Sequence, residues 1–310
     1  MSAPPLFARM LDDAALFPPG DAPMERAVPR HRALRQGPSA DYVGPFIVAE
    51  AWLGDLEAVL AEEAEETAGG AGPMGALEIT VTVPRGPAAI GPALQRARRM
   101  PRVRVVGVEA AAVPANAAGG GPAGGTDPAA AVRTAAQALT EHLPEGTLGH
   151  VEVPRGADPA PAMAALAGAG HRAKFRTGGT TADAFPSEAE LAARIAAAVD
   201  AEVPFKCTAG LHNAVRHTGA DTGFEHHGFL NVLLAADALL RGAHTADAEG
   251  VLGERDGKTL AREARTVLAD ERRSRAVRAA FTGFGTCSVD EPLEDLEALG
   301  LSPGTPADDA

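Results

Sequence analysis

The chain has 310 residues, enough for two domains of ordinary size or one large barrel domain. Its 41 acidic and 28 basic residues give a formal net charge of -13, which disfavours nucleic acid and anionic membrane surfaces as partners. No apolar run approaches the length of a membrane span, and the first residues carry acids where a secretory signal is apolar, so we expect a cytoplasmic protein.

Short β-rich runs, each followed by an Ala-rich helical stretch, recur eight times. This alternation is typical of parallel βαβ units. The eight predicted strands are Ala8–Ala14, Gly44–Ala51, Ala76–Val83, Val103–Ala110, Leu148–Val153, His171–Arg176, Val203–Thr208 and Ala280–Cys287. The clearest helices between them are Leu53–Thr67, Pro128–His142 and Ser187–Asp200, the last of which begins with a capping Ser and has a Glu three residues later.

Eight strands with eight intervening helices predict an α/β protein, a (β/α)8 TIM barrel with a long insertion between strands 7 and 8. An open doubly wound sheet is the alternative, but no GxGxxG follows the first strand and no GxxxxGK[ST] occurs. We expect one barrel domain over residues 1–302 and a disordered tail over 303–310. The low-complexity stretch Ala115–Thr126 should be a disordered surface insertion or a flap over the barrel mouth.

The segment between the seventh and eighth strands is about 70 residues long, far more than one helix needs. It contains a His-rich stretch and then the apolar run Leu230–Leu240. Because barrels keep their chemistry on the loops that follow the strands, this excess lies where function is expected.

Lysine is rare, with only Lys174, Lys206 and Lys258 among the 28 basic residues. An amine can lose its proton and act as a nucleophile, which a guanidinium cannot. Side chains alternate along a strand, and an unpaired charge under the outer helices is costly, so charged strand residues should face inward. The side chains predicted to face the barrel mouth are those of Asp12, Glu109, Glu152, Lys174, Arg176, Lys206 and Thr208, with Phe175, Phe205 and Cys207 facing outward.

Two lysines on neighbouring strands suggest Schiff-base chemistry. A second cation and partial desolvation should lower the pKa of one amine, which could then attack a carbonyl group and form an iminium that stabilises a neighbouring carbanion. The acids Glu109 and Asp12, with a water molecule, would move the protons. The same charged residues could instead form a satisfied ring of ion pairs with a structural role, and the spacing alone leaves both readings open.

Five short motifs occur in order along the chain. They are DDAALFP at Asp12–Pro18, TVTVP at Thr80–Pro84, KFRTG at Lys174–Gly178, FKCTAG at Phe205–Gly210 and FGTCS at Phe284–Ser288. Together they resemble the class I aldolases of the deoxyribose-phosphate aldolase type, whose first, third, sixth, seventh and eighth strands read DHTLLKP, TVTxFP, KTSTG, FKPAGG and FGASS. The stretches PFKCTAGLHNAVR and HHGFLN also resemble a bacterial family with no assigned activity.

The resemblance implies a metal-independent lyase without a cofactor, in which Lys174 is the Schiff-base nucleophile and Lys206 tunes it. It places the proton-relay acids at Asp12 and at Glu109, where the family has a shorter acid. The chain departs from the family at Arg176, which replaces a small hydroxyl residue, after Lys206, and in its long insertion. The predicted substrate is therefore a small anionic carbonyl compound.

The residues that we expect to bind this substrate follow the strands or lie in the long loop. They are Glu152, Arg176, Gly178, Gly179, Thr208, His212, Asn213, Arg216 and Ser288. Arg216 and Asn213 would suit an anionic group, with the guanidinium as a two-pronged clamp. We expect neither nucleic acid nor membrane partners, and the protein could assemble as a homo-oligomer.

Two other functions are compatible with the sequence. The side chains of His212, His217, Glu225, His226 and His227 could hold a divalent metal whose bound water acts as a nucleophile, as in a hydrolase or isomerase. Alternatively, the chain is a non-catalytic barrel that binds a small anion, because a fold does not guarantee chemistry.

Overall fold

The computed structural model describes residues 3–68, 75–112, 127–156 and 158–302. The whole Gly-rich segment Ala115–Thr126 and the tail 303–310 therefore lie outside the described residues, together with our expectations for them. Within the described ranges, no helix is long and apolar enough to cross a membrane.

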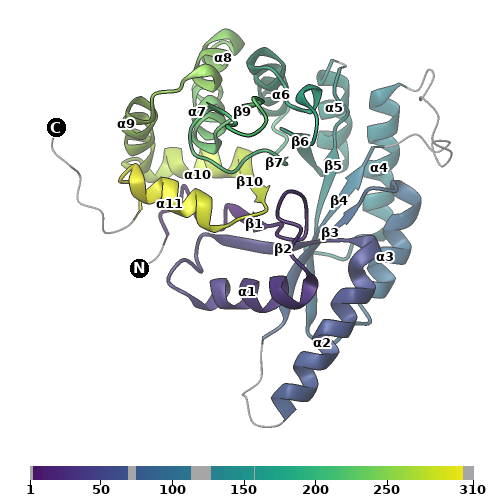
Figure 1. Cartoon of the computed structure of the whole chain (residues 1–310). Helices are drawn as coiled ribbons and strands as arrows, with labels where there is room; N and C mark the ends of the chain where they lie inside the picture. Colours follow the sequence, from purple (N-terminus) through teal and green to yellow (C-terminus); the bar gives the residue numbers. More distant parts are fainter. Residues whose placement is uncertain (1–2, 69–74, 113–126, 157, 303–310) are drawn as a thin grey trace.

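Eight parallel strands form a closed barrel (Figure 1). They are β1 (Leu11–Asp13), β2 (Val43–Ala49), β3 (Leu77–Val83), β4 (Val103–Ala111), β5 (Leu148–Glu152), β6 (Arg172–Arg176), β7 (Phe205–Thr208) and β10 (Phe281–Thr286). Each pairs with its neighbours in the order β1-β10-β7-β6-β5-β4-β3-β2. The predicted (β/α)8 barrel is confirmed, and each predicted strand overlaps an observed one.

Helices follow the strands and cover the outside of the barrel (Figure 1). The single helices are α1 (Met24–Gln36), α2 (Leu53–Ala68), α3 (Ile90–Ala97), α4 (Pro128–His142), α5 (Ala160–Ala169), α6 (Glu188–Asp200) and α11 (Asp290–Ala298). Short 3-10 turns lie at η1 (Glu50–Trp52), η2 (Pro87–Ala89) and η3 (Ala182–Ala184). The side chain of Ser187 accepts a hydrogen bond from the Glu190 amide, which confirms the predicted start of α6.

Apolar side chains on the outer face of the strands form the layer beneath the helices. Phe175 and Phe205 are fully buried with ring centroids 5.3 Å apart, and Phe205 stacks in turn on Phe281. A buried polar pair also joins this layer, since His31 of α1 lies 3.0 Å from the Asp13 carboxylate of β1. Burying the outer face in this way leaves the alternate positions of each strand to face the barrel interior.

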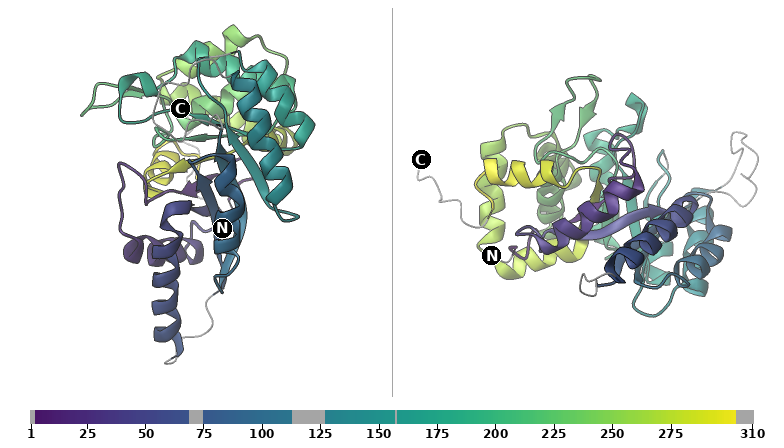
Figure 2. Two further views of the ribbon diagram at one scale, coloured as in Figure 1. Left: turned by 90° about the vertical axis from the view of Figure 1, so that its right-hand side faces the viewer. Right: turned by 60° about the horizontal axis from the view of Figure 1, so that its bottom comes forward.

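The predicted insertion lies between β7 and β10 and fills the seventh helical position of the barrel. It consists of β8 (His217–Thr218), β9 (Glu225–His226), α7 (Phe229–Leu240), α8 (Thr245–Gly253), α9 (Gly257–Leu268) and α10 (Glu271–Ala280). The strands β8 and β9 pair as an antiparallel hairpin, and α7 packs against α6, α8, α9 and α10. In both views of Figure 2 these green helices remain grouped on one side of the barrel.

A buried amide fixes the insertion to the rest of the chain. Asn231, fully buried in α7, accepts a hydrogen bond from the Arg216 amide and donates to the carbonyls of Val251 and Glu254. Because every polar atom of this side chain has a partner, its burial is compatible with a stable helix layer.

Candidate active site

Six charged side chains in the barrel form a chain of alternating charge. In contact order they are Asp12 of β1, Lys206 of β7, Glu109 of β4, Lys174 of β6, Glu152 of β5 and Arg176 of β6. The structure thus brings together all four predicted catalytic residues and two of the predicted substrate-binding residues.

Glu109 is the centre of this chain of charges. Its Oε1 accepts a hydrogen bond from Lys206 at 2.5 Å, and its Oε2 lies 2.7 Å from Nζ of Lys174. Lys206 also donates to Asp12, while Lys174 also lies 3.2 Å from the Glu152 carboxylate. One carboxylate therefore joins both lysines, and each lysine has a second acid of its own.

Parallel strand pairing explains why residues distant in sequence meet here. Lys174 is the register partner of Lys206 on one side and of Glu152 on the other. Because paired residues of adjacent strands point to the same face of a sheet, all three side chains enter the barrel together. Glu109 and Asp12 reach the same region from β4 and β1.

The site needs a glycine at position 44 of β2. A Cβ atom there would clash with Oδ1 of Asp12. The absence of a side chain at Gly44 therefore leaves space for the Asp12 carboxylate beside Lys206. Glycine is needed here because the two residues approach closely, not because the backbone has an unusual conformation.

The lysine pKa values differ in direction from the sequence-based expectation. Burial and the neighbouring Lys206 both act to lower the pKa of Lys174, as predicted, but the contacts with Glu109 and Glu152 outweigh them and raise it. The pKa of Lys206 is also raised, because Asp12 and Glu109 together outweigh burial. The expected lowering is therefore wrong for this arrangement, since Glu109 was predicted as a proton carrier and Glu152 as a substrate-binding residue, and their effect on the pKa of Lys174 was not considered.

The acids of the cluster respond unequally to the same environment. Burial acts to raise the pKa of Glu109, but two ammonium groups hold it well below its usual range. The pKa of Asp12 is raised, because its burial outweighs the single contact with Lys206. Among the three acids, Asp12 is the one with a raised pKa, so it takes up a proton more readily than Glu109.

Sequence reasoning missed one buried residue beside the cluster. His150 of β5 is the register partner of Glu109 and is buried, and its Nδ1 has no hydrogen-bond partner. Burial, followed by the charge of Lys206, lowers the pKa of this imidazole well below its usual value, so it is neutral. Its position two residues before the inward-facing Glu152 was the signal that could have identified it.

The arginine at the outer end of the cluster is only partly engaged. Arg176 donates from Nε to Glu152 at 2.9 Å, and 43% of its side chain is exposed. Its two Nη groups make no hydrogen bond with any described residue. Of the predicted anion-binding groups, this guanidinium is the one that has free donors at the barrel mouth.

The turns after β6 and β7 pack tightly against each other. A Cβ atom at Gly178 would lie 2.9 Å from the Cα of Gly210 and 2.8 Å from the ring of Phe185, while one at Gly179 would lie 2.7 Å from Ala184. The carbonyl of Thr208 accepts a hydrogen bond from the Thr177 amide. Gly178 and Gly179 thus have a packing role that sequence reasoning did not anticipate.

The predicted anion clamp in the long loop is already occupied. Arg216 is buried, and its Nη2 lies 2.8 Å from Glu188 and 3.1 Å from Glu225. It therefore fastens the β8–β9 hairpin to α6, and its expected role as a substrate clamp is not supported. The sequence could not show this, because the two acids lie on separate elements.

Carboxylates of α11 meet the other polar residues of this loop. The amide of Asn213 donates to Asp295 at 3.3 Å, and Nδ1 of His212 lies 3.1 Å from Glu291. Ser288, predicted to bind an anion, accepts a hydrogen bond from the Glu291 amide through its hydroxyl oxygen. These three side chains are thus tied to the first turns of α11.

The four histidines of the metal alternative do not converge. His217 and His226 stack with ring centroids 5.0 Å apart, whereas His227 is buried and donates from Nε2 to the Pro186 carbonyl. His212 lies against Glu291 and Cys287 instead. The described part of the chain contains no group of three or more His, Cys, Asp or Glu side chains arranged to hold a metal ion.

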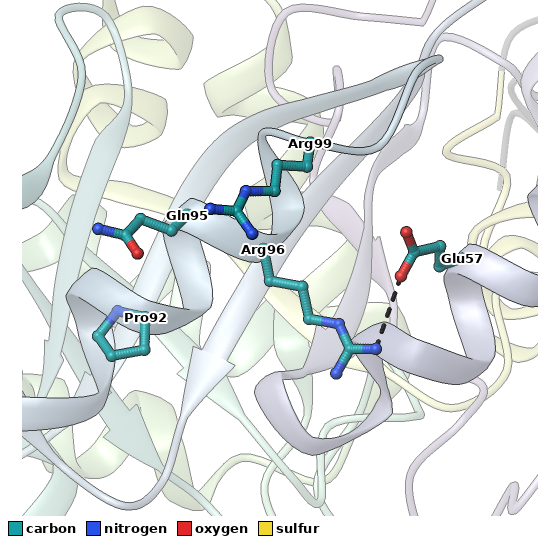
Figure 3. Close-up of a pocket in the computed structure, with 5 residues that line it drawn as sticks. All are labelled: Glu57, Pro92, Gln95, Arg96 and Arg99. Atoms are coloured by element: carbon teal, nitrogen blue, oxygen red, sulfur yellow. Dashed lines mark ion pairs between the residues drawn. The ribbon is translucent and has the colours of Figure 1, made fainter.

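A surface pocket lies away from the barrel mouth, between α2 and α3 (Figure 3). Its lining residues are Glu57, Pro92, Gln95, Arg96 and Arg99. Arg96 and Glu57 form an ion pair of 3.6 Å across it. The pocket shares no residue with the cluster of charges and so does not alter the choice of site.

Comparison with known proteins gives a distant likeness only. No family model matches the chain, and no curated protein matches it. Among solved structures, the chain is similar to the deoxyribose phosphate aldolase from Aeropyrum pernix, which is described as having a unique tetrameric structure. The two are 14% identical over 95% of this chain and 93% of the other, with a TM-score of 0.49.

Proposed function

We propose that this protein is a class I aldolase or related lyase that forms a Schiff base with a small anionic carbonyl compound, and that Lys174 is the nucleophile. The observation that carries the proposal is the contact of both lysines with the single buried carboxylate of Glu109. Both strands continue for only two residues beyond these lysines, toward the end of the barrel where (β/α)8 enzymes place their catalytic groups.

The two lysines are not equivalent, which supports the choice of Lys174. Lys206 has two close carboxylate partners, Asp12 and Glu109. The second acid of Lys174 is Glu152, which is more distant at 3.2 Å and has a partly exposed side chain. Lys174 is therefore the amine that loses its proton with less loss of electrostatic stabilisation.

The reaction begins when the ammonium of Lys174 passes a proton to water. The free amine adds to the carbonyl carbon and forms a carbinolamine. Protonation of its hydroxyl then lets water leave. Asp12, whose pKa is raised, is the proposed proton donor. The resulting iminium accepts the electron pair of an adjacent C–C bond, or stabilises the carbanion that forms one. The net change, ammonium and carbonyl to iminium and water, conserves charge and requires no metal.

The positive and negative charges of the cluster are equal in number, which favours a second candidate function. Three cations alternate with three carboxylates, and every charge has an opposite neighbour. Such an arrangement is also what a structural ion-pair network in a non-catalytic, anion-binding barrel would have. Only a test of amine reactivity separates the two functions.

Borohydride trapping provides that test. The folded protein is incubated with a panel of small aldehydes and ketones and with borohydride, and peptide mapping then locates the added mass. We expect an adduct on Lys174, which Lys174→Arg abolishes without unfolding the barrel.

The exposed Lys258 of α9 is the matched control, because Lys258→Arg should leave the adduct in place. A folded protein that acquires no adduct from any member of the panel would favour the structural network. An adduct on Lys206 instead would keep the chemistry and exchange the roles of the two lysines.

A further inference from the structure

We infer that the carbonyl substrate is a 2-oxo acid, whose carboxylate adjoins the carbonyl group and is bound by Arg176. This inference rests on the proposed function, because it concerns the compound that reacts with Lys174. It excludes a sugar phosphate, in which the anion lies farther from the carbonyl and carries more charge.

The spacing of Lys174 and Arg176 supports a short substrate. The single carboxylate of Glu152 spans the two side chains, with Oε2 3.2 Å from Nζ of Lys174 and Oε1 2.9 Å from Nε of Arg176. The amine and the guanidinium are thus one carboxylate group apart. A ligand bonded to Nζ through its carbonyl carbon needs its anionic group on the next carbon to reach Arg176.

The free donors of Arg176 suit a carboxylate. Glu152 occupies Nε, which leaves the planar Nη pair at the partly exposed end of the side chain for a ligand. Two parallel N–H donors match the geometry of a carboxylate. The carboxylate of Glu152 is already paired with Lys174 and Arg176. The iminium formed at Lys174 has the same positive charge as the ammonium that it replaces, so this pairing is retained.

The region where barrels usually bind phosphate is acidic in this chain. Phosphate commonly lies at the loops after the seventh and eighth barrel strands and at the start of the following helix. Here the first turn of α11 carries Asp290 and Glu291, and Glu291 contacts His212 of the seventh loop. The amide of Ala214 in that loop donates to Asp295 of the same helix. These carboxylates would repel a phosphate dianion and occupy the donors that could bind it.

Three two-carbon aldehydes with a carboxylate, a hydroxyl or a phosphate beside the aldehyde group test the inference. Glyoxylate is a 2-oxo acid, glycolaldehyde is neutral and glycolaldehyde phosphate has a phosphate. The rate of borohydride-dependent labelling of Lys174 is measured for each aldehyde with the wild type, Arg176→Gln and Arg176→Lys. For each aldehyde, the labelling rate of a variant is divided by that of the wild type, which removes the intrinsic reactivity of the aldehyde from the comparison.

We expect Arg176→Gln to slow labelling by glyoxylate roughly 10- to 100-fold relative to its effect on the two other aldehydes, as loss of a charge-assisted pair predicts. Arg176→Lys, which keeps the charge but loses the fork, should have an intermediate effect. The matched control is Arg104→Gln, since Arg104 is exposed at the opposite end of β4 from Glu109 and should not affect any rate.

Other outcomes identify which statement is wrong. If Arg176→Gln lowers the rate of Lys174 labelling equally for all three aldehydes, the inference is overturned, because Arg176 would then act only by holding Glu152. A selective decrease in the labelling rate with glycolaldehyde phosphate would also overturn the inference and would identify phosphate as the bound anion. Labelling of Lys174 by none of the aldehydes, nor by pyruvate, would refute the proposed function itself.

Discussion

Lys174 and Lys206 occupy paired positions on β6 and β7, and their amines contact opposite oxygens of Glu109 at 2.7 Å and 2.5 Å. Neither amine can change its charge without altering the field of the other, because the carboxylate between them is shared. The two lysines therefore behave as one coupled system, and a substitution at any of the three positions affects all of them.

Glu109→Gln should destabilise the protein by about 3 kcal/mol, because it leaves two buried ammonium groups without their common partner. Denaturant unfolding measures this change. The control Glu57→Gln removes an exposed carboxylate that pairs with Arg96 and should cost less than about 1 kcal/mol. Equal stability of the Glu109 variant and the control would mean that the cluster does not depend on this carboxylate.

The rate of Lys174 labelling should increase with pH. The pKa of Lys174 is raised, and only the free amine attacks a carbonyl, so each pH unit from 6 to 9 should increase the rate about tenfold. Lys206→Met removes a cation that lowers this pKa and releases Glu109 to act on Lys174 alone, so the rate should fall at every pH with the slope retained. A rate that does not change with pH would argue against a raised pKa.

Arg216→Gln should act on stability and not on reactivity. The substitution removes the ion pairs of Arg216 with Glu188 of α6 and with Glu225 of β9, and we expect a loss of about 2 kcal/mol of stability. Labelling of Lys174 by a neutral aldehyde should keep the wild-type rate below the unfolding temperature. Thermal unfolding, monitored by circular dichroism, measures the stability of the variant. A stable variant with an altered rate of Lys174 labelling would instead indicate that Arg216 acts on the substrate.

Gly44→Ala should impair the site through Asp12. The added methyl group would clash with the Asp12 carboxylate and displace it from Lys206, so the rate of iminium formation should fall. Gly250→Ala in α8 is a suitable comparison, because its Cβ would meet no atom within 4 Å outside the adjoining backbone of its own helix, and alanine favours a helix. Wild-type labelling in the Gly44 variant would contradict the role given to Asp12.

Chelation should leave the labelling of Lys174 unchanged, because Schiff-base formation by an amine needs no metal ion. Labelling is compared before and after exhaustive dialysis against a chelator. Loss of labelling that zinc or manganese restores would return attention to His212, His217, His226 and His227.

Periodicity was sufficient to predict the barrel. Strands alternate with helices at regular intervals, and the bounds of α4 agree with those predicted, because Pro128 at its first position and Pro144 and Gly146 after its end are local signals. The four helices of the insertion were not predicted individually, since no strand separates them and α7 is buried at nearly every position, which leaves its sequence without an amphipathic period.

Alternation along the strands also predicted which charges enter the barrel, because a charge is costly on the outer face. It did not predict the sign of the lysine pKa shifts, which depends on distances of a few tenths of an ångström between Lys174, Glu109 and Glu152. The role of Arg216 was also out of reach, because its partners Glu188 and Glu225 approach only when the insertion has folded.

The contact between Asp12 and Lys206 joins positions 194 residues apart, and the strand that holds β1 beside β7 is β10, the last of the barrel. During synthesis, a chain that has not yet reached residue 281 contains both lysines and their three acids but lacks β10, the strand that closes the barrel. We expect its amines to titrate as ordinary, hydrated lysines. The raised pKa of Lys174 is thus a property of the finished barrel and should appear only when β10 closes it.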